Sequence, residues 1–278
     1  IGSLALQLSK TIGTGEVILL ENVRFYQEET QGDQDFAIEL AKLGDIYVND
    51  AFGTAHRAHA STTIVAQFFE DKCAGYIMGS ELANAKKVLK DPNRPFTAIM
   101  GGAKISDKIM IIEKLLDKVD NLIIGGGMSY TFIKAQGGAI GKSLCEEDRQ
   151  AYTLELMGKA KIKNVNLCLP LDNIIADDFS NHANRQIVKS GGIPDNWQGL
   201  DIGPKSISAF QKIIKKSKTI LWNGPMGVFE FQNFAVGTEA IAEAVVSATQ
   251  NGSFSLIGGG DSAAAINNMN YGNKVSYV

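Results

Sequence analysis

Short aliphatic and β-branched runs alternate with helical patterns along the whole chain. The runs that predict strands are 17–20, 45–48, 97–100, 121–124, 165–169, 219–222 and 254–257. Between them, apolar residues recur at helical spacing, most clearly over 105–116 and 235–248. This alternation is typical of an α/β protein with mainly parallel sheets, whose core the apolar helix faces would form.

A boundary helix is predicted from Gly79 to Lys90, with Ser80 as its N-cap. The two prolines in 91–95 cannot continue this helix. We place the domain boundary here. The predicted parts are an incomplete N-terminal domain over 1–79, an interdomain helix over 80–92 and a C-terminal domain over 93–278.

Four successive strands of the C-terminal part each end in a glycine turn that a helix follows. The turns are Gly101-Gly102-Ala103-Lys104, Gly125-Gly126-Gly127, Asn223-Gly224-Pro225-Met226-Gly227 and Gly258-Gly259-Gly260-Asp261. In a parallel sheet all four lie on one edge, where doubly wound proteins bind nucleotides. The plainer alternative is that glycine only allows tight turns there.

Two other glycine motifs are weaker. Residues 137–143 end like a phosphate-binding loop, but Gln136 stands where that motif needs glycine, and a helical stretch precedes it. Gly258, Gly260 and Ala263 match the dinucleotide fingerprint, whose acidic ribose partner would fall beyond the last residue. An NAD-dependent dehydrogenase therefore stays open as a minor alternative.

Charged residues accompany the glycine turns. Lys104 and Lys108 are four apart at the predicted start of a helix, where the helix dipole disfavours cations, so a bound anion would remove the conflict. Solvated surface lysines are the alternative. Asp261 follows three glycines and is interpreted either as a helix N-cap or, beside phosphates, as a ligand of Mg²⁺.

The N-terminal part carries a second cluster of cations. Arg24 follows the first predicted strand, and the loop 51–60 holds His56, Arg57 and His59. The planar fork of arginine suits carboxylate and phosphate oxygens, so the cluster predicts a small-anion site, with an ordinary surface loop as the alternative. The two histidines have too few further ligands to indicate a metal.

Charge and cysteine content narrow the class of protein. The net charge is −3, from 27 basic and 30 acidic residues, so attraction to nucleic acid or an anionic membrane is not expected. No apolar run reaches the length of a membrane span, and no secretory leader is visible. Cys73, Cys145 and Cys168 lack disulfide or zinc spacing and are expected to be core residues of a cytoplasmic protein.

Several stretches resemble the phosphoglycerate kinase family, in that family's order and over nearly all of the chain. They read ENVRF, DIYVNDAFGTAHRAHAS, MGGAKISDKI, GGGMSYTF, WNGPMGVFE and LIGGGDS. The resemblance implies two Rossmann-like domains with mainly parallel sheets and a cleft between them. One domain would hold 3-phosphoglycerate and the other the nucleotide with Mg²⁺.

The resemblance also implies roles for particular residues. Arg24, His56 and Arg57 would bind the phosphoglycerate, whereas Lys108, with Lys104 nearby, would contact the nucleotide phosphates and the transferred group. The implied nucleotide-binding residues are Gly102, Gly126, Gly127, Leu200, Asn223, Gly227, Glu230, Gly259, Gly260, Asp261 and Ser262. Glu230 would contact the ribose, and Asp261 would hold Mg²⁺ directly or through water. Ser262 replaces the threonine common there but keeps the hydroxyl.

The implied reaction moves a phosphoryl group between 1,3-bisphosphoglycerate and ADP, giving 3-phosphoglycerate and ATP in glycolysis and gluconeogenesis. Neither nucleophile has a proton to lose, so positioning and charge neutralisation suffice without a general base. A non-catalytic nucleotide-binding protein on the same fold is the alternative, and a monomer is expected. The family's opening strand and closing helix are not found, and the match skips a strand between Lys10 and Thr11, which suggests part of a longer protein.

Overall fold

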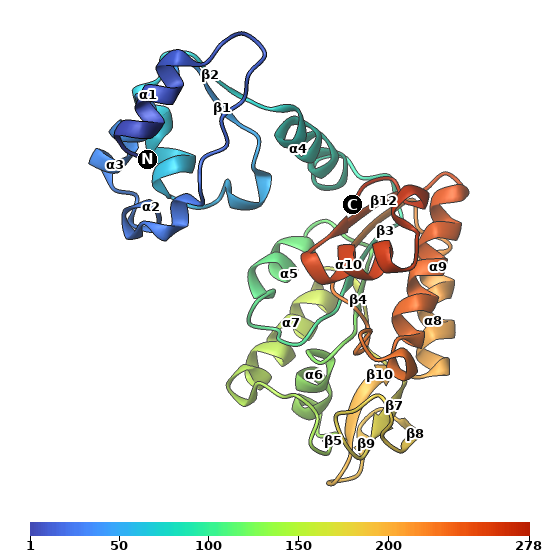
Figure 1. Cartoon of the computed structure of the whole chain (residues 1–278). Helices are drawn as coiled ribbons and strands as arrows, with labels where there is room; N and C mark the ends of the chain where they lie inside the picture. Colours follow the sequence, from blue (N-terminus) through green and yellow to red (C-terminus); the bar gives the residue numbers. More distant parts are fainter. The chain divides into compact units, whose positions relative to one another are not determined.

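The computed structural model describes residues 1–278, which form two compact units, Ile1–Ala85 and Lys86–Val278. Figure 1 shows both units, each described here by itself. Helix α4 (Tyr76–Leu89) contains the limit between them. It begins before Ser80, so the expected N-cap role of Ser80 is wrong. No helix in either unit combines the length and apolar character that a membrane span requires.

The C-terminal unit is built on a five-stranded parallel sheet in the order β12-β11-β3-β4-β6. Its strands are β3 (Phe96–Met100), β4 (Asn121–Ile124), β6 (Asn166–Cys168), β11 (Thr219–Asn223) and β12 (Phe254–Gly258). These strands confirm five of the predicted runs and the parallel α/β class. Continuous apolar runs mark them because both faces of the sheet are covered.

Helices cover the two faces of this sheet (Figure 1). The helices are α5 (Ile109–Leu115), α6 (Ser129–Ala135), α7 (Gln150–Ile162), α8 (Pro204–Ile214), α9 (Val236–Gln250) and α10 (Gly260–Asn268). Side chains of β3 alternate between two cores: Phe96 and Met100 pack with α5 and α7, whereas Ile99 packs with α8 and α9. The strand period of two thus divides one apolar run between both layers.

A second, antiparallel sheet was not predicted. It has the order β10-β7-β8, formed by β7 (Asp172–Ala176), β8 (Arg185–Lys189) and β10 (Gln198–Ile202). Two short strands, β5 (Ala139–Ile140) and β9 (Gly192–Ile193), pair beside it. Polar residues interrupt the apolar pattern of these strands, and β8 is mostly exposed, so no run stood out.

The N-terminal unit contains little sheet. Its strands β1 (Tyr47–Asn49) and β2 (Lys72–Ala74) pair in parallel, and its helices are α1 (Ser3–Thr11), α2 (Gln27–Gln31), α3 (Gln34–Ala41) and the first part of α4. The predicted strand 17–20 is wrong, because Val17 and Leu19 are 90% and 94% exposed and no strand pairs with them. Helix α1 runs unbroken through Lys10 and Thr11.

The cysteines are not the core residues that were expected. Cys73 is exposed, and Cys145 and Cys168 are partly buried. Burial raises the pKa of the Cys168 thiol. All three are free thiols, and no group of three or more His, Cys, Asp or Glu residues is arranged to hold a metal ion.

Candidate nucleotide and anion sites

The four glycine turns meet at the carboxyl edge of the parallel sheet. Backbone hydrogen bonds join the turns after β3, β4 and β11: the Gly101 N–H donates to the Asn223 carbonyl at 3.0 Å, and the Gly126 N–H donates to the Met226 carbonyl at 3.1 Å. Gly126 also has a φ of 65°. A Cβ there would lie 2.5 Å from the Gly102 nitrogen, so this position requires glycine.

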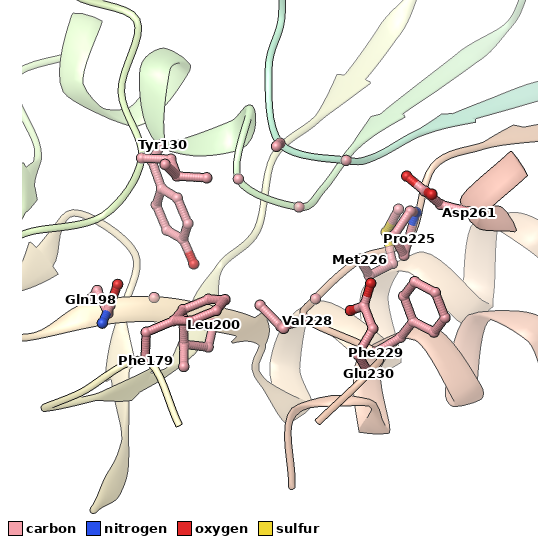
Figure 2. A pocket seen from close by; sticks show the side chains of 17 residues that line it. Tyr130, Phe179, Gln198, Leu200, Pro225, Met226, Val228, Phe229, Glu230 and Asp261 are labelled. Atoms are coloured by element: carbon pink, nitrogen blue, oxygen red, sulfur yellow. The ribbon is translucent and has the colours of Figure 1, made fainter. Parts of the chain in front are cut away.

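A pocket with a volume of about 340 Å³ adjoins these turns. Figure 2 shows Asp261 at one end of it and Tyr130 with Gln198 at the other. Seven of the predicted nucleotide-binding residues line the pocket: Gly102, Gly126, Gly127, Leu200, Gly227, Glu230 and Asp261. Glycine backbone at one end and apolar side chains at the other make room for a flat ring joined to anionic groups.

The other predicted nucleotide-binding residues, Asn223, Gly259, Gly260 and Ser262, lie outside the lining of this pocket. The Ser262 side chain is buried, and its hydroxyl accepts a hydrogen bond from the Gly224 N–H at 2.5 Å. Ser262 therefore supports the turn after β11 from beneath. A Cβ at Gly259 would lie 2.8 Å from the Asn223 amide oxygen, so the turns after β11 and β12 touch.

The two lysines are not on one helix face, which corrects the prediction. Lys108 is the N-cap residue of α5, and Lys104 lies in the preceding loop, where its side chain is exposed. The Lys108 ammonium donates to the Asn223 carbonyl at 3.2 Å and also to the Asn223 amide oxygen. Burial lowers the pKa of Lys108, although the charges of Asp261 and Asp107 oppose this shift. A half-buried cation thus stands at the sheet edge.

Asp261 is not an N-cap either. Gly259 is the N-cap residue of α10, and Asp261 lies in the first turn with its side chain exposed at the pocket. A carboxylate in a first helical turn interacts favourably with the helix dipole. The negative charge of Asp261 raises the pKa of Lys108 and so opposes the effect of burial on that lysine.

Glu146 was missed by the sequence analysis. Its carboxylate accepts the backbone N–H groups of Ile105 at 2.6 Å and Ser106 at 3.1 Å. Burial alone would raise the pKa of Glu146, but these hydrogen bonds and the Lys104 charge outweigh it and lower the pKa. Glu146 therefore fixes the loop that carries both lysines. It is distant in sequence from this loop, and no local motif marks it.

Asp201 is a second missed residue, beneath the pocket. It is 1% exposed and accepts the N–H groups of Gly237 at 2.7 Å and Ile202 at 2.8 Å. A Cβ at Gly227 would collide with its carboxylate. Burial raises the pKa of Asp201 to about 7, against the hydrogen bonds from these two N–H groups. The residue ties β10 to the first turn of α9.

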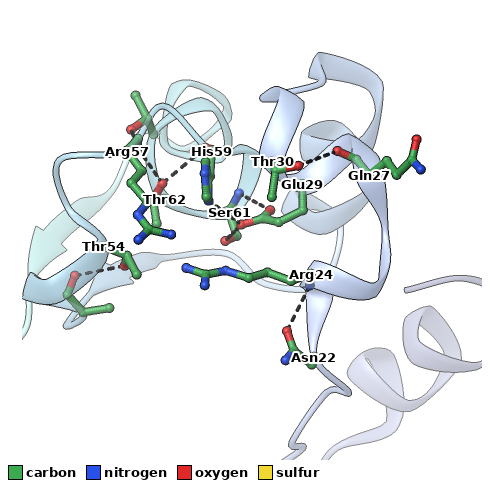
Figure 3. Close-up of polar contacts among 12 residues, drawn as sticks. Asn22, Arg24, Gln27, Glu29, Thr30, Thr54, Arg57, His59, Ser61 and Thr62 are labelled. Carbon is green, nitrogen blue, oxygen red and sulfur yellow. Dashed lines mark hydrogen bonds and ion pairs between the residues drawn. The ribbon is translucent and has the colours of Figure 1, made fainter. Parts of the chain in front are cut away.

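Of the predicted cation cluster in the N-terminal unit, Arg24, His56 and Arg57 are exposed, whereas His59 is partly buried. Arg24 lies in a single 3₁₀ turn (Val23–Phe25), and its backbone N–H donates to the Asn22 side chain at 3.0 Å. Arg57 is held through its carbonyl, which accepts the hydroxyls of Thr62 and Thr63 at 2.9 Å each. Figure 3 shows the side chains of Arg24 and Arg57 extending toward the same open space. His56 lies in the same loop as Arg57.

A parallel sheet with glycine turns beside an elongated pocket, and a lysine and a carboxylate at its edge, is typical of α/β proteins that handle a phosphorylated nucleotide. The sequence profile described as "Phosphoglycerate kinase" matches residues 1–278, and the chain belongs to this family. Family membership confirms the resemblance found in the sequence.

Individual relatives agree with this assignment. The phosphoglycerate kinase of Porphyromonas gingivalis is 50% identical over 303 aligned positions, which cover 100% of this chain and 72% of that protein. A cytosolic phosphoglycerate kinase of Nicotiana tabacum is 52% identical over 98% of this chain and 68% of its own length. The solved structure of phosphoglycerate kinase from Coxiella burnetii has a TM-score of 0.86 and 44% identity, covering 95% of this chain and 68% of that one.

Membership of this family makes the chain an enzyme of phosphoryl transfer with nucleotide and phosphoglycerate substrates, and the glycolytic reaction is the activity of the family. The two alternatives, a non-catalytic nucleotide-binding protein and an NAD-dependent dehydrogenase, are not favoured. The α/β fold class is confirmed as well.

Proposed function

We propose that the two substrates bind to different units. Arg24, His56 and Arg57 hold 3-phosphoglycerate in the N-terminal unit, whereas the glycine turns of the C-terminal unit hold ADP or ATP. The exposed arginines support the first assignment, because free guanidinium groups pair with phosphate and carboxylate in a bidentate manner. The pocket beside the glycine turns supports the second. On this basis the domain division at 1–79, 80–92 and 93–278 also remains our proposal.

Within the nucleotide site, the ribose lies near Glu230. The residues around the purine are Gly102, Gly126, Gly127, Leu200 and Gly227, and those around the phosphates are Gly259, Gly260, Asp261 and Ser262. The position of Asp261 at one end of the pocket supports this direction. A nucleotide placed the other way would bring its phosphates beside Phe179 and Leu200, which offer no hydrogen bonds to them, and away from Asp261.

Asp261 is the proposed residue for Mg²⁺. A single carboxylate suits a Mg²⁺ ion that binds together with the nucleotide. Such an ion keeps several waters and needs only one or two protein carboxylates besides the substrate phosphates. One pocket-facing carboxylate meets this need, and the chain offers no larger ligand cluster. When bound, Mg²⁺ neutralises charge on the phosphate oxygens.

Lys108 is the main proposed catalytic residue, and Lys104, in the preceding loop, is proposed to assist it. The observation on which this rests is that the Lys108 ammonium is half-buried at the sheet edge and anchored by Asn223. A preorganised cation in a partly desolvated position stabilises charge that moves during transfer. No side chain needs to remove a proton, because the acceptors are a carboxylate and a phosphate oxygen.

Transfer requires the units to approach each other with both substrates bound, because reacting atoms must come within roughly 3 to 3.5 Å in a dry site. We expect small-angle scattering of the full-length protein to show a more compact particle with both ligands than with either alone. The absence of compaction with both ligands would contradict the two-domain mechanism.

A coupled assay on the full-length protein tests the activity itself. ATP formation from 1,3-bisphosphoglycerate and Mg-ADP is the expected result, and binding of nucleotide without turnover would restore the non-catalytic alternative. Titration calorimetry distinguishes a kinase from an NAD-dependent dehydrogenase. Binding of NADH with no binding of ADP would contradict the proposal.

The protein is further proposed to be a cytoplasmic monomer that binds neither nucleic acid nor membranes. The "cytosolic" names of two plant relatives support the proposed location.

A further inference from the structure

Glu29 is a buried carboxylate that the proposed reaction does not use. It lies on α2, the helix that follows Arg24, and is 2% exposed. A carboxylate removed from water is costly unless hydrogen bonds satisfy it. The groups that satisfy Glu29 therefore indicate what it does.

Both of its hydrogen-bond donors come from Ser61, just beyond the loop that carries Arg57. The Ser61 N–H donates to the carboxylate at 2.9 Å, and the Ser61 hydroxyl donates at 2.6 Å. Nδ1 of His59 lies 3.8 Å from Glu29 Oε1, is buried and has no hydrogen-bond partner. Figure 3 shows Glu29 facing both Ser61 and His59.

A second contact joins the same two segments. Gly32, which ends α2, has a φ of 68°, and a Cβ there would lie 2.5 Å from the Ala58 carbonyl oxygen. The end of α2 thus touches the loop next to Arg57, while Glu29 holds the loop further on. Two contacts fix the separation of two segments better than one, because they remove rotation about a single anchor.

We infer that Glu29 is a positioning residue that sets the separation between Arg24 and Arg57, and so the spacing at which the two guanidinium groups meet a phosphorylated carboxylic acid. Glu29 itself touches no substrate. The inference rests on the proposed function, in which both arginines bind 3-phosphoglycerate. An error of about 1 Å in such spacing is enough to weaken a bidentate contact severely.

The main test is Glu29→Leu in the full-length protein, which removes both acceptors and keeps an apolar side chain of similar size. We expect the KM for 3-phosphoglycerate to rise about tenfold, with kcat and the KM for ATP unchanged. Glu29→Gln restores most of the affinity, because the amide can accept the Ser61 N–H and donate to the Ser61 hydroxyl. Glu28→Leu, at an exposed neighbour on α2, is the matched control and leaves the KM unchanged.

A double-mutant cycle separates positioning from general damage. In an Arg57→Ala background, Glu29→Leu should raise the KM no further, because no second guanidinium remains to be spaced. A further tenfold rise there, or an equal rise in the KM for ATP, would overturn the inference. If Glu29→Leu does not fold, Ser61→Ala replaces it: a KM increase that vanishes in the Arg57→Ala background supports positioning, and one that persists contradicts it.

The inference and the proposed function fail differently. If Arg57→Ala alone leaves the KM for 3-phosphoglycerate unchanged, the proposed anion site is wrong. If Arg57→Ala raises the KM but both Glu29→Leu and Ser61→Ala do not, the anion site stands and Glu29 has no positioning role.

Discussion

The two units of the molecule fix their candidate sites by different means. In the C-terminal unit a five-stranded sheet holds the glycine turns, and backbone hydrogen bonds join three of the four turns. In the N-terminal unit the sheet is a pair of strands of three residues each, and the segments proposed to bind the anion are joined by side chains such as Glu29. The C-terminal site is therefore sensitive to added volume, and the N-terminal site to lost charge and hydrogen bonds.

Adding a methyl group at Gly126 is the change expected to have the largest effect. Gly126→Ala forces an alanine into a left-handed conformation and against the Gly102 and Pro225 backbone. Strain and overpacking together should cost about 2 to 5 kcal/mol in nucleotide affinity or in stability. Titration of ADP, with thermal unfolding in parallel, measures both. Gly158→Ala, in α7 with nothing near its Cβ, is the control and should be neutral or slightly stabilising.

Removing the Lys108 ammonium is next in size. Lys108→Ala should raise the barrier by about 3 kcal/mol, or on the order of a hundredfold in kcat, with a much smaller change in the KM for nucleotide. Steady-state kinetics in both directions provide the measurement, and Lys114→Ala, at an exposed position on α5, is the control. An unchanged kcat would refute the catalytic role of Lys108.

The N-terminal site should respond differently. Arg57→Ala should weaken 3-phosphoglycerate binding by about 1.5 to 3 kcal/mol, the range of a charged hydrogen bond, while Mg-ADP affinity measured alone stays the same. Arg57→Lys keeps the charge but not the planar fork and should recover only part of the loss. Loss of nucleotide binding in folded Arg57→Ala would contradict the separation of the two sites.

The last expected effect is a change in the pH dependence of stability at Asp201, which is small within any one pH unit. Its folded-state pKa of about 7 lies above the ordinary value of 3.8, so between these two values the folded state binds more protons than the unfolded state. The free energy of unfolding should then fall as pH rises through this window, by at most about 1.4 kcal/mol per pH unit. Urea unfolding from pH 5 to pH 8 should show a flatter profile for Asp201→Asn. An identical slope in both proteins would show that burial does not raise this pKa, and Asp195→Asn, at an exposed carboxyl, is the control.

Sequence patterns predicted the parallel sheet well because its strands are buried on both faces. The run 121–124 matches β4, and 219–222 falls within β11. The antiparallel sheet was missed because strands such as β8 expose most of their side chains and mix charged residues into the run. The strand predicted at 17–20 was wrong because a short aliphatic run is not enough where no neighbouring strand supplies hydrogen bonds.

The candidate site could be predicted only where the chemistry is local. Glycine turns after strands and the histidine-arginine loop stand out in a short window of sequence. Glu146, Asp201 and Glu29 do not, since each acts on backbone N–H groups that include distant partners: Glu146 on Ile105, Asp201 on Gly237 and Glu29 on Ser61. Such pairs come together only through the fold.

Asn223 accepts hydrogen bonds from the Lys108 ammonium when no phosphate is bound. Because the Lys108 ammonium already donates to the carbonyl and side-chain oxygens of Asn223, a phosphate that reaches it exchanges one set of hydrogen bonds for another. The net gain from an exchange is far smaller than the full strength of a new bond. When a product leaves, the Lys108 ammonium can donate to Asn223 again. Release of the phosphate therefore does not leave the lysine without hydrogen-bond acceptors. The contacts with Asn223 therefore limit the affinity of Lys108 for a bound phosphate. A limited affinity favours rapid product release over tight binding.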